Sequence, residues 1–301
     1  MFVAIIISIL AALFYSLTNH IDKFLVNDNN SESNIKTVLI FSTFISGLFA
    51  PIWFIISGFD ISISIISLIS IFTSSILSIS ALYLYFKSLE VSDTSTVVVM
   101  FQLIPVFNYI LGLILFKENL DFRQIIGSIF IILSTILISI NLENKKTSFK
   151  VLLLMTLCSF FYSLYYILFD IGIRNSPYNS CIFYLQIGYL LIGLIFLFIK
   201  SFRSTFFKTI KCNGKKFLSL NIINELLNII GTCLENYANV LIPIALVTVI
   251  SRVQVIFVFI IGLIGTIFLP KYFKEDISKK TILKKVFCIM LSIVGFIIAF
   301  I

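Results

Sequence analysis

Ten stretches of mostly apolar residues follow one another along the chain, and they restrict its fold more than any other feature. A helix of about 20 apolar residues crosses the roughly 30 Å hydrocarbon core of a bilayer. The apolar runs are continuous rather than alternating, which argues against a β-barrel. Only 12% of the residues are charged, whereas a soluble domain carries about 25%. We therefore expect an all-α integral membrane protein with ten transmembrane helices. The predicted spans are Phe2–Asn19, Lys36–Ile56, Ile63–Phe86, Thr96–Phe116, Phe122–Ile140, Val151–Phe169, Cys181–Ile199, Phe217–Val240, Ala245–Leu269 and Ile282–Ile301.

The second half of the chain repeats features of the first half. Pairs of identical residues lie 152 positions apart: Thr96 and Thr248, Gln102 and Gln254, Tyr85 and Tyr237. The tetrapeptide Phe14–Leu17 also recurs as Phe161–Leu164. Internal repeats of this kind are typical of transporters built from inverted halves. We predict two five-helix repeats, residues 1–142 and 150–301, joined by a Lys-rich linker.

The eighth apolar stretch carries six polar residues at steps of four and three: Asn221, Glu225, Asn228, Thr232, Glu235 and Asn239. This spacing places all six on one helix face, which must avoid acyl chains. Charged groups inside a membrane are costly and are functional candidates by default. Arg252 of the ninth stretch lies within reach of Glu235 across the hairpin, so we predict an ion pair between them; a direct role in substrate binding is the alternative. Glu225 lies about 15 Å from Glu235 at 1.5 Å per residue. We predict that it faces a central cavity and supports transport, as the site of a coupling proton or of a bound cation.

Other polar residues extend the candidate site. His20 is the one histidine and follows the first apolar stretch. It is either an interfacial helix end or a titratable group at a cavity mouth. Pro105 removes a helical hydrogen bond and is expected to bend a helix that faces inward. The predicted substrate-binding residues are Asn19, His20, Gln102, Tyr165, Glu225, Asn228, Thr232, Glu235, Arg252 and Gln254.

The net charge of +8 comes from basic residues between the apolar stretches. This pattern indicates membrane orientation rather than nucleic-acid binding. The predicted loops Asn27–Asn34 and Ser201–Lys216 are polar, and the second is strongly basic. Most Lys and Arg residues lie in loops after odd-numbered stretches, so the positive-inside rule places these loops in the cytoplasm and both termini outside. The five cysteines are scattered and indicate neither a disulfide framework nor a metal site.

The segment Leu103–Val106, the turn Phe116–Leu120 and the segment Gln124–Gly127 resemble the EamA-type proteins of the drug/metabolite transporter superfamily. That family has a proline in helix 4, a glutamate in the next turn and a glycine in helix 5. The resemblance implies alternating access and a central cavity lined by helices 1, 3, 4, 6, 8 and 9. It also implies cytoplasmic termini, opposite to the charge distribution. The second repeat departs from the pattern, with Phe257 at the proline position and Gly295 late in the last stretch.

We therefore predict a secondary transporter, not an enzyme, that moves a small polar metabolite such as an amino acid across the cytoplasmic membrane of a bacterium. A proton or another gradient would drive it. The alternatives are a flippase for a lipid or lipid-linked sugar and a membrane-embedded enzyme acting on lipid-linked substrates. The expected partners are the solute and the bilayer, with a homodimer left open. We expect no cofactor, no metal and no nucleic acid.

Overall fold

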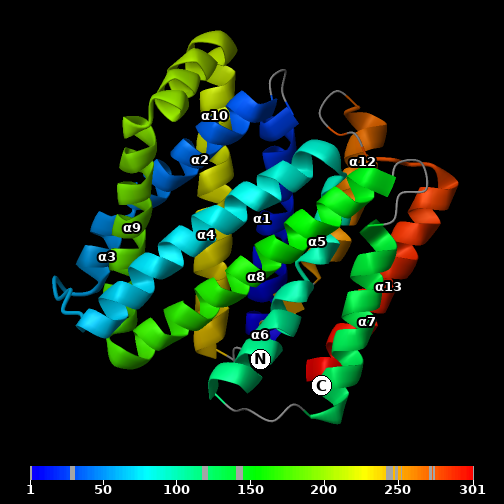
Figure 1. The fold of residues 1–301 in the computed structure, drawn as a ribbon, viewed down its shortest axis with the longest axis horizontal. Coiled ribbons are helices and arrows are strands. Elements are labelled where there is room, and N and C mark those ends of the chain that lie inside the picture. The colour runs from blue at the N-terminus through cyan, green and yellow to red at the C-terminus, as the bar shows by residue number, and fades with distance from the viewer. Residues whose placement is uncertain are drawn as a thin grey trace. The chain divides into compact units, whose positions relative to one another are not determined.

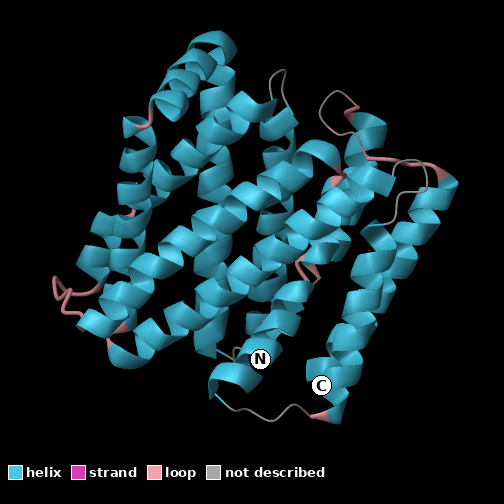
Figure 2. Ribbon diagram, in the orientation of Figure 1, coloured by secondary structure: helices cyan, strands magenta, loops and turns pink. Residues whose placement is uncertain are grey.

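The computed structural model is helical wherever it describes regular structure (Figure 2). It describes residues 2–27, 31–116, 121–139, 145–241, 247, 250–251, 253–270, 273 and 275–300, and no strand occurs among them. Eight segments are long and apolar enough to cross a membrane, and two shorter apolar helices cover Phe122–Ile138 and Gln254–Phe268. The described part of the chain is thus all-α, as predicted. The count of ten spans stays a prediction.

The helices follow the predicted apolar stretches but differ from them at several ends. Their bounds are α1 Phe2–Asn27, α2 Ser31–Leu48, α3 Ala50–Ile56, α4 Ile65–Val91, α5 Thr94–Met100, α6 Leu103–Phe116, α7 Phe122–Ser139, α8 Lys145–Asn175, α9 Tyr178–Phe198, α10 Lys200–Leu241, α12 Gln254–Phe268 and α13 Lys279–Phe300.

The helix predicted over Thr96–Phe116 is in fact two helices, α5 and α6, separated at Phe101 and Gln102. Pro105 lies in the first turn of α6, where a missing N–H costs no helical hydrogen bond. The Phe101 carbonyl, which Pro105 cannot bond, accepts from the backbone N–H of Ile104 at 3.0 Å. The prediction that Pro105 bends a continuous helix is therefore wrong, because the break precedes the proline.

The segment Ser201–Lys216, predicted as a basic loop, is helical as well. α10 begins at Lys200 and continues to Leu241, a length of about 63 Å at 1.5 Å per residue. Phe202 and Phe206 are four residues apart and pack on one side of it. The prediction of a loop relied on the high density of charge in this segment, whereas the spacing of its aromatic residues is that of a helix. The loop predicted over Asn27–Asn34 is likewise too long, since α2 begins at Ser31.

The chain divides into two compact units, each drawn from both halves of the sequence. Unit 1 comprises Met1–Phe24, Ser88–Thr156 and Leu226–Ile301, and unit 2 comprises Leu25–Lys87 and Leu157–Glu225. These units are a division by packing, whereas the predicted repeats 1–142 and 150–301 are a division by sequence. The repeats therefore stay a prediction.

In unit 1, α7 packs along α13, and α5 packs against α12 and α13 (Figure 1). The contact between α7 and α13 depends on small residues. A Cβ atom at Gly295 would lie 2.8 Å from the carbonyl oxygen of Gly127. Two turns along α7, the Ser134 hydroxyl donates to the carbonyl of Cys288 at 2.8 Å. The face of α7 that carries Gly127 and Ser134 is thus a close helix–helix contact.

In unit 2, α9 packs against α2 and α3 (Figure 1). Glycines again allow close approach, since a Cβ at Gly193 would lie 2.7 Å from the Thr43 hydroxyl. The serines of α4 bind neighbouring backbone: Ser67 donates to the carbonyl of Gly172 at 2.8 Å, and Ser74 lies 3.4 Å from the carbonyl of Tyr165. The serine face of α4 therefore serves helix packing.

Candidate functional site

The polar stripe predicted on the eighth stretch lies on α10 and is divided between the two units. Asn221 and Glu225 fall in unit 2 and are 2% and 5% exposed. Asn228, Thr232 and Glu235 fall in unit 1, where the first two are exposed and Glu235 is partly buried. Each part of the stripe therefore has its own surroundings.

In unit 2, Glu225 is a buried carboxyl that accepts a short hydrogen bond from the Ser42 hydroxyl of α2. One turn earlier, the Asn221 amide donates to the carbonyl of Phe217 at 2.8 Å. Burying an ionised carboxyl is costly unless other groups bind it. The predictions that Glu225 faces a central cavity and binds a coupling proton or a cation stay predictions.

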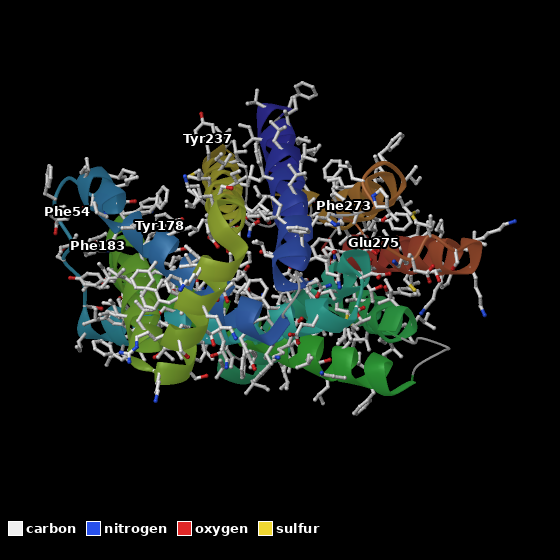
Figure 3. All side chains as sticks on the ribbon, turned by 90° about the horizontal axis from the view of Figure 1, so that it is seen from above. Phe54, Tyr178, Phe183, Tyr237, Phe273 and Glu275 are labelled. Carbon is white, nitrogen blue, oxygen red and sulfur yellow. The ribbon has the colours of Figure 1, made fainter. Side chains whose placement is uncertain are left out.

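Tyr165 also lies in unit 2, within an aromatic group on α8. Its ring stacks on Phe169 at a centroid distance of 6.1 Å and meets Tyr166 at 4.9 Å. On α9, the Tyr189 hydroxyl donates to Ser78 at 3.1 Å, and Tyr165 and Tyr189 interact through their side chains. Figure 3 labels Phe54, Tyr178 and Phe183 in the same unit. Tyr165 is therefore part of a packed aromatic cluster.

In unit 1, Glu235 is bound by two hydroxyl groups. The Tyr15 hydroxyl of α1 lies 3.0 Å from one carboxylate oxygen, and the Ser251 hydroxyl donates to the other at 3.1 Å. Tyr15 also lies 3.2 Å from the Thr232 hydroxyl. Tyr15 has a single proton to donate, and the carboxylate is the stronger acceptor. Gly231 makes room for the Tyr15 ring, because a Cβ there would lie 3.0 Å from the ring.

The polar face of α1 continues from Tyr15 to the start of α12. The Gln254 amide donates to Asn19 at 2.8 Å, and the Ser16 hydroxyl lies 3.2 Å from the Gln254 carbonyl. The structure thus brings together four predicted residues: Asn19, Thr232, Glu235 and Gln254. Sequence reasoning missed Tyr15, Ser16 and Ser251, although the first two belong to the repeated Phe14–Leu17 motif.

Gln102 lies at the break between α5 and α6, and its repeat partner Gln254 lies at the start of α12. Val253, which precedes α12, donates to the carbonyl of Ile250 at 3.0 Å in a tight turn. Gln102 is 1% exposed, and among the described residues its side-chain oxygen has no hydrogen-bond donor. Buried polar atoms are normally paired. This oxygen is therefore a candidate acceptor for a ligand.

His20 has a defined environment inside unit 1. Its Nε2 lies 2.8 Å from the carbonyl of Val258, so this nitrogen carries the proton. The ring lies against Phe273 at 5.1 Å and is 7% exposed. His20 does not lie at a helix end, because α1 continues past it to Asn27. The prediction of a titratable group at a cavity mouth stays a prediction.

A buried ion cluster next to His20 was not predicted. The Lys285 ammonium lies 2.7 Å from Glu275 and 2.6 Å from Asp93. Ser95 donates to Glu275 through its backbone N–H at 3.1 Å and its hydroxyl at 2.6 Å. Figure 3 shows Glu275 beside Phe273, both from the segment between α12 and α13. The sequence signal was Lys285 in the first turn of the predicted span Ile282–Ile301, and it was not named as a candidate.

The pKa values of the two carboxyl groups in this ion cluster are shifted in opposite directions. Burial raises the pKa of Glu275, but the Lys285 ammonium and the hydrogen bonds from Ser95 outweigh it and leave the pKa below its ordinary value. Burial raises the pKa of Asp93, the Glu275 charge raises it further, and Lys285 does not fully offset them. The cluster holds two carboxyls against one ammonium, so Asp93 is the one that protonates first.

Two predicted site residues remain, Arg252 and Asn228. Arg252 lies outside the described residues, so its ion pair with Glu235 stays a prediction. Asn228 is exposed, and its carbonyl accepts from the Thr232 hydroxyl at 2.9 Å. Among the described residues, no group of three His, Cys, Asp or Glu side chains could hold a metal ion.

Residues 2–140 match a protein-family model described as the EamA-like transporter family. No protein of curated function matches the chain in sequence. A solved structure described as "Crystal structure of protein" has a TM-score of 0.56 and 13% sequence identity, over 97% of this chain and 94% of that chain. At this identity the likeness shows a shared fold over nearly the whole chain.

Proposed function

We propose that the whole chain is a secondary transporter of a small polar metabolite, such as an amino acid, because residues 2–140 match a model of the EamA-like transporter family. EamA proteins are transporters rather than enzymes. The helices of the described chain suit a multi-pass membrane protein. We further propose that it lies in a bacterial cytoplasmic membrane, that a proton gradient drives it, and that it can form a homodimer.

Helix packing supports two inverted repeats. Several pairs of contacting helices hold corresponding positions in the predicted halves. α7 and α13 are the fifth helices, α2 and α9 are the second helices, and α5 and α12 belong to the fourth helices. Elements close to a two-fold axis contact their own symmetry mates. This pattern is expected of repeats related by such an axis.

The observation that carries the proposal is the cluster around Glu235 in unit 1. A carboxylate inside an apolar helical protein is bound by the hydroxyls of Tyr15 and Ser251. These hydroxyl groups bring no positive charge, so the cluster suits a solute with an ammonium group. We propose that an amino group binds here and that Glu225 carries the coupling proton.

Transport into proteoliposomes tests this function. Purified protein would be reconstituted and given radiolabelled amino acids and small amines, with and without an imposed pH gradient. Accumulation that depends on the gradient is the expected result. Movement of a fluorescent lipid between leaflets without uptake of any solute would favour the flippase and overturn the proposal.

The substitution Glu225→Gln separates coupling from binding. It should abolish gradient-driven accumulation while solute exchange across the membrane continues, because a neutral amide can bind solute but cannot release a proton. Asp170→Asn is a matched control, since Asp170 forms an exposed pair with Arg174 at 2.6 Å. Normal accumulation by Glu225→Gln would show that Glu225 is not the coupling group.

A further inference from the structure

The first part of α10 has one face made of cations. Lys200, Arg203, Lys208, Lys211 and Lys215 are all exposed. At 100° per residue they fall on one side of the helix, within about 140°. The sequence from Lys200 to Lys216 contains no acidic residue. This positive charge is therefore not balanced within the segment.

The opposite side of the same segment packs on α9 and α2, within unit 2. Phe202 stacks on Phe196 of α9 with ring centroids 4.6 Å apart. Phe206 lies 5.2 Å from Phe41 of α2, and Thr209 is 4% exposed. These contacts fix the rotation of the helix about its axis. The cationic face therefore points away from α9 and α2.

The segment lies between two stretches able to cross the membrane, Tyr178–Phe198 and Phe217–Glu235. It is therefore at a membrane surface rather than in the hydrocarbon core. In Figure 1 the first, yellow-green part of α10 turns away from the direction of its long yellow part. Phe198 and Phe207 are 83% and 60% exposed at this end. Exposed aromatic rings beside cations are typical of helices that lie in the interface.

We propose that the cationic face of α10, formed by Lys200, Arg203, Lys208, Lys211 and Lys215, binds the phosphate headgroups of anionic lipids. Each basic residue near a membrane surface favours an anionic lipid by about fivefold, and an arginine can bind a phosphate with two hydrogen bonds. Phe198 and Phe207 would enter the bilayer beside the headgroups. This role does not depend on which solute the protein carries, or on transport at all.

Quenching by brominated lipids tests the proposal in the full-length protein. Trp53 is the single tryptophan, and Trp53→Phe combined with Phe207→Trp moves the fluorophore to the cationic face. The protein would be reconstituted in vesicles that contain either brominated phosphatidylglycerol or brominated phosphatidylcholine. Ile195→Trp in the same Trp53→Phe protein is the matched control, because Ile195 is 57% exposed on the adjacent span.

The fluorophore at position 207 should be quenched more by the anionic lipid, with a preference of at least about fivefold. Replacing Lys200, Arg203, Lys208, Lys211 and Lys215 with Gln should bring the preference close to one, as should high salt. The fluorophore at position 195 should show no preference. Equal quenching by both lipids at position 207 would mean apolar contact alone, and no quenching by either would place the face in water or against a protein. Either result would overturn the proposal.

Discussion

Replacing Lys285 with methionine should destabilise unit 1 strongly at neutral pH. Lys285 is 3% exposed and its ammonium binds both Glu275 and Asp93. Methionine fills a similar volume without charge. The two carboxyls then face each other without the Lys285 ammonium, and Glu275 keeps its hydrogen bonds from Ser95.

The expected cost is about 3–5 kcal/mol, the range for removing one partner of a buried ion pair. At about 2–4 °C per kcal/mol, the apparent Tm should fall by roughly 6 °C or more. Lys284→Met is the matched control. Lys284 is the adjacent residue and donates to the carbonyl of Ile138 at 3.2 Å, but it is only partly buried. A hydrogen bond with a charged donor contributes roughly 1.5–3 kcal/mol, and partial exposure of Lys284 lowers its cost, so the control should lose less than Lys285→Met.

The cost should also depend on pH. In the wild type the pKa of Glu275 is lowered, so ionisation of Glu275 stabilises the fold above the pKa of the unfolded chain. This contribution is lost as the pH falls through the lower folded value. In the variant without Lys285, the effect of burial dominates and raises the pKa of Glu275. Protonation of Glu275 then removes an unfavourable buried charge and stabilises the variant. The difference between the two proteins should therefore be largest near pH 7 and shrink below about pH 5.

A thiol-reactive dye provides the assay, because Cys158, Cys181 and Cys288 are buried and become reactive on unfolding. The double variant Lys285→Met, Glu275→Gln should recover part of the loss, since it removes one unpaired carboxylate. The electrostatic account of the cluster is refuted if Lys285→Met has the same Tm as the Lys284→Met control at pH 7. It is also refuted if the difference in Tm between Lys285→Met and the wild type grows at acid pH.

Three other predictions concern unit 1. Tyr15→Phe removes a hydroxyl from Glu235 and should raise the apparent KM for solute several-fold while leaving expression unchanged, as measured by uptake and by protein level. Glu235→Gln should lower the Tm, and the added Arg252→Gln should restore part of it if the two side chains pair, whereas additive losses would exclude the pair. Gly295→Ala should cost about 1–3 kcal/mol, because its Cβ would press on the Gly127 carbonyl; an unchanged Tm would show that the two helices can separate at no cost.

The positions of most helices were predictable because membrane-spanning helices are long and continuously apolar. The breaks between helices were harder to predict. Pro105 indicated an irregularity, but a proline fits the first turn of a new helix as well as the middle of a bent one. In the segment that begins at Lys200, charge suggested a loop, whereas the spacing of Phe202 and Phe206 follows a helical period.

The candidate site was predicted in part, because intramembrane polar residues stand out against an apolar background. Glu235, Thr232, Asn19 and Gln254 were found in this way and lie together. Tyr15 and Ser251 were missed because tyrosine and serine are common in ordinary helix packing. Lys285 and Glu275 were missed for another reason: they are ten residues apart across a turn, and only the fold shows that both are buried with Asp93.

The break between α5 and α6 is maintained by what Pro105 lacks rather than by a bond that could be broken. No donor at position 105 can reach the Phe101 carbonyl, and Ile104 already occupies it. A continuous helix across this joint would lack the hydrogen bond that a residue at position 105 normally donates, and the proline ring would crowd the Phe101 carbonyl. The two helices can therefore merge only into a bent helix, and a residue with a backbone N–H at position 105 would remove that restriction.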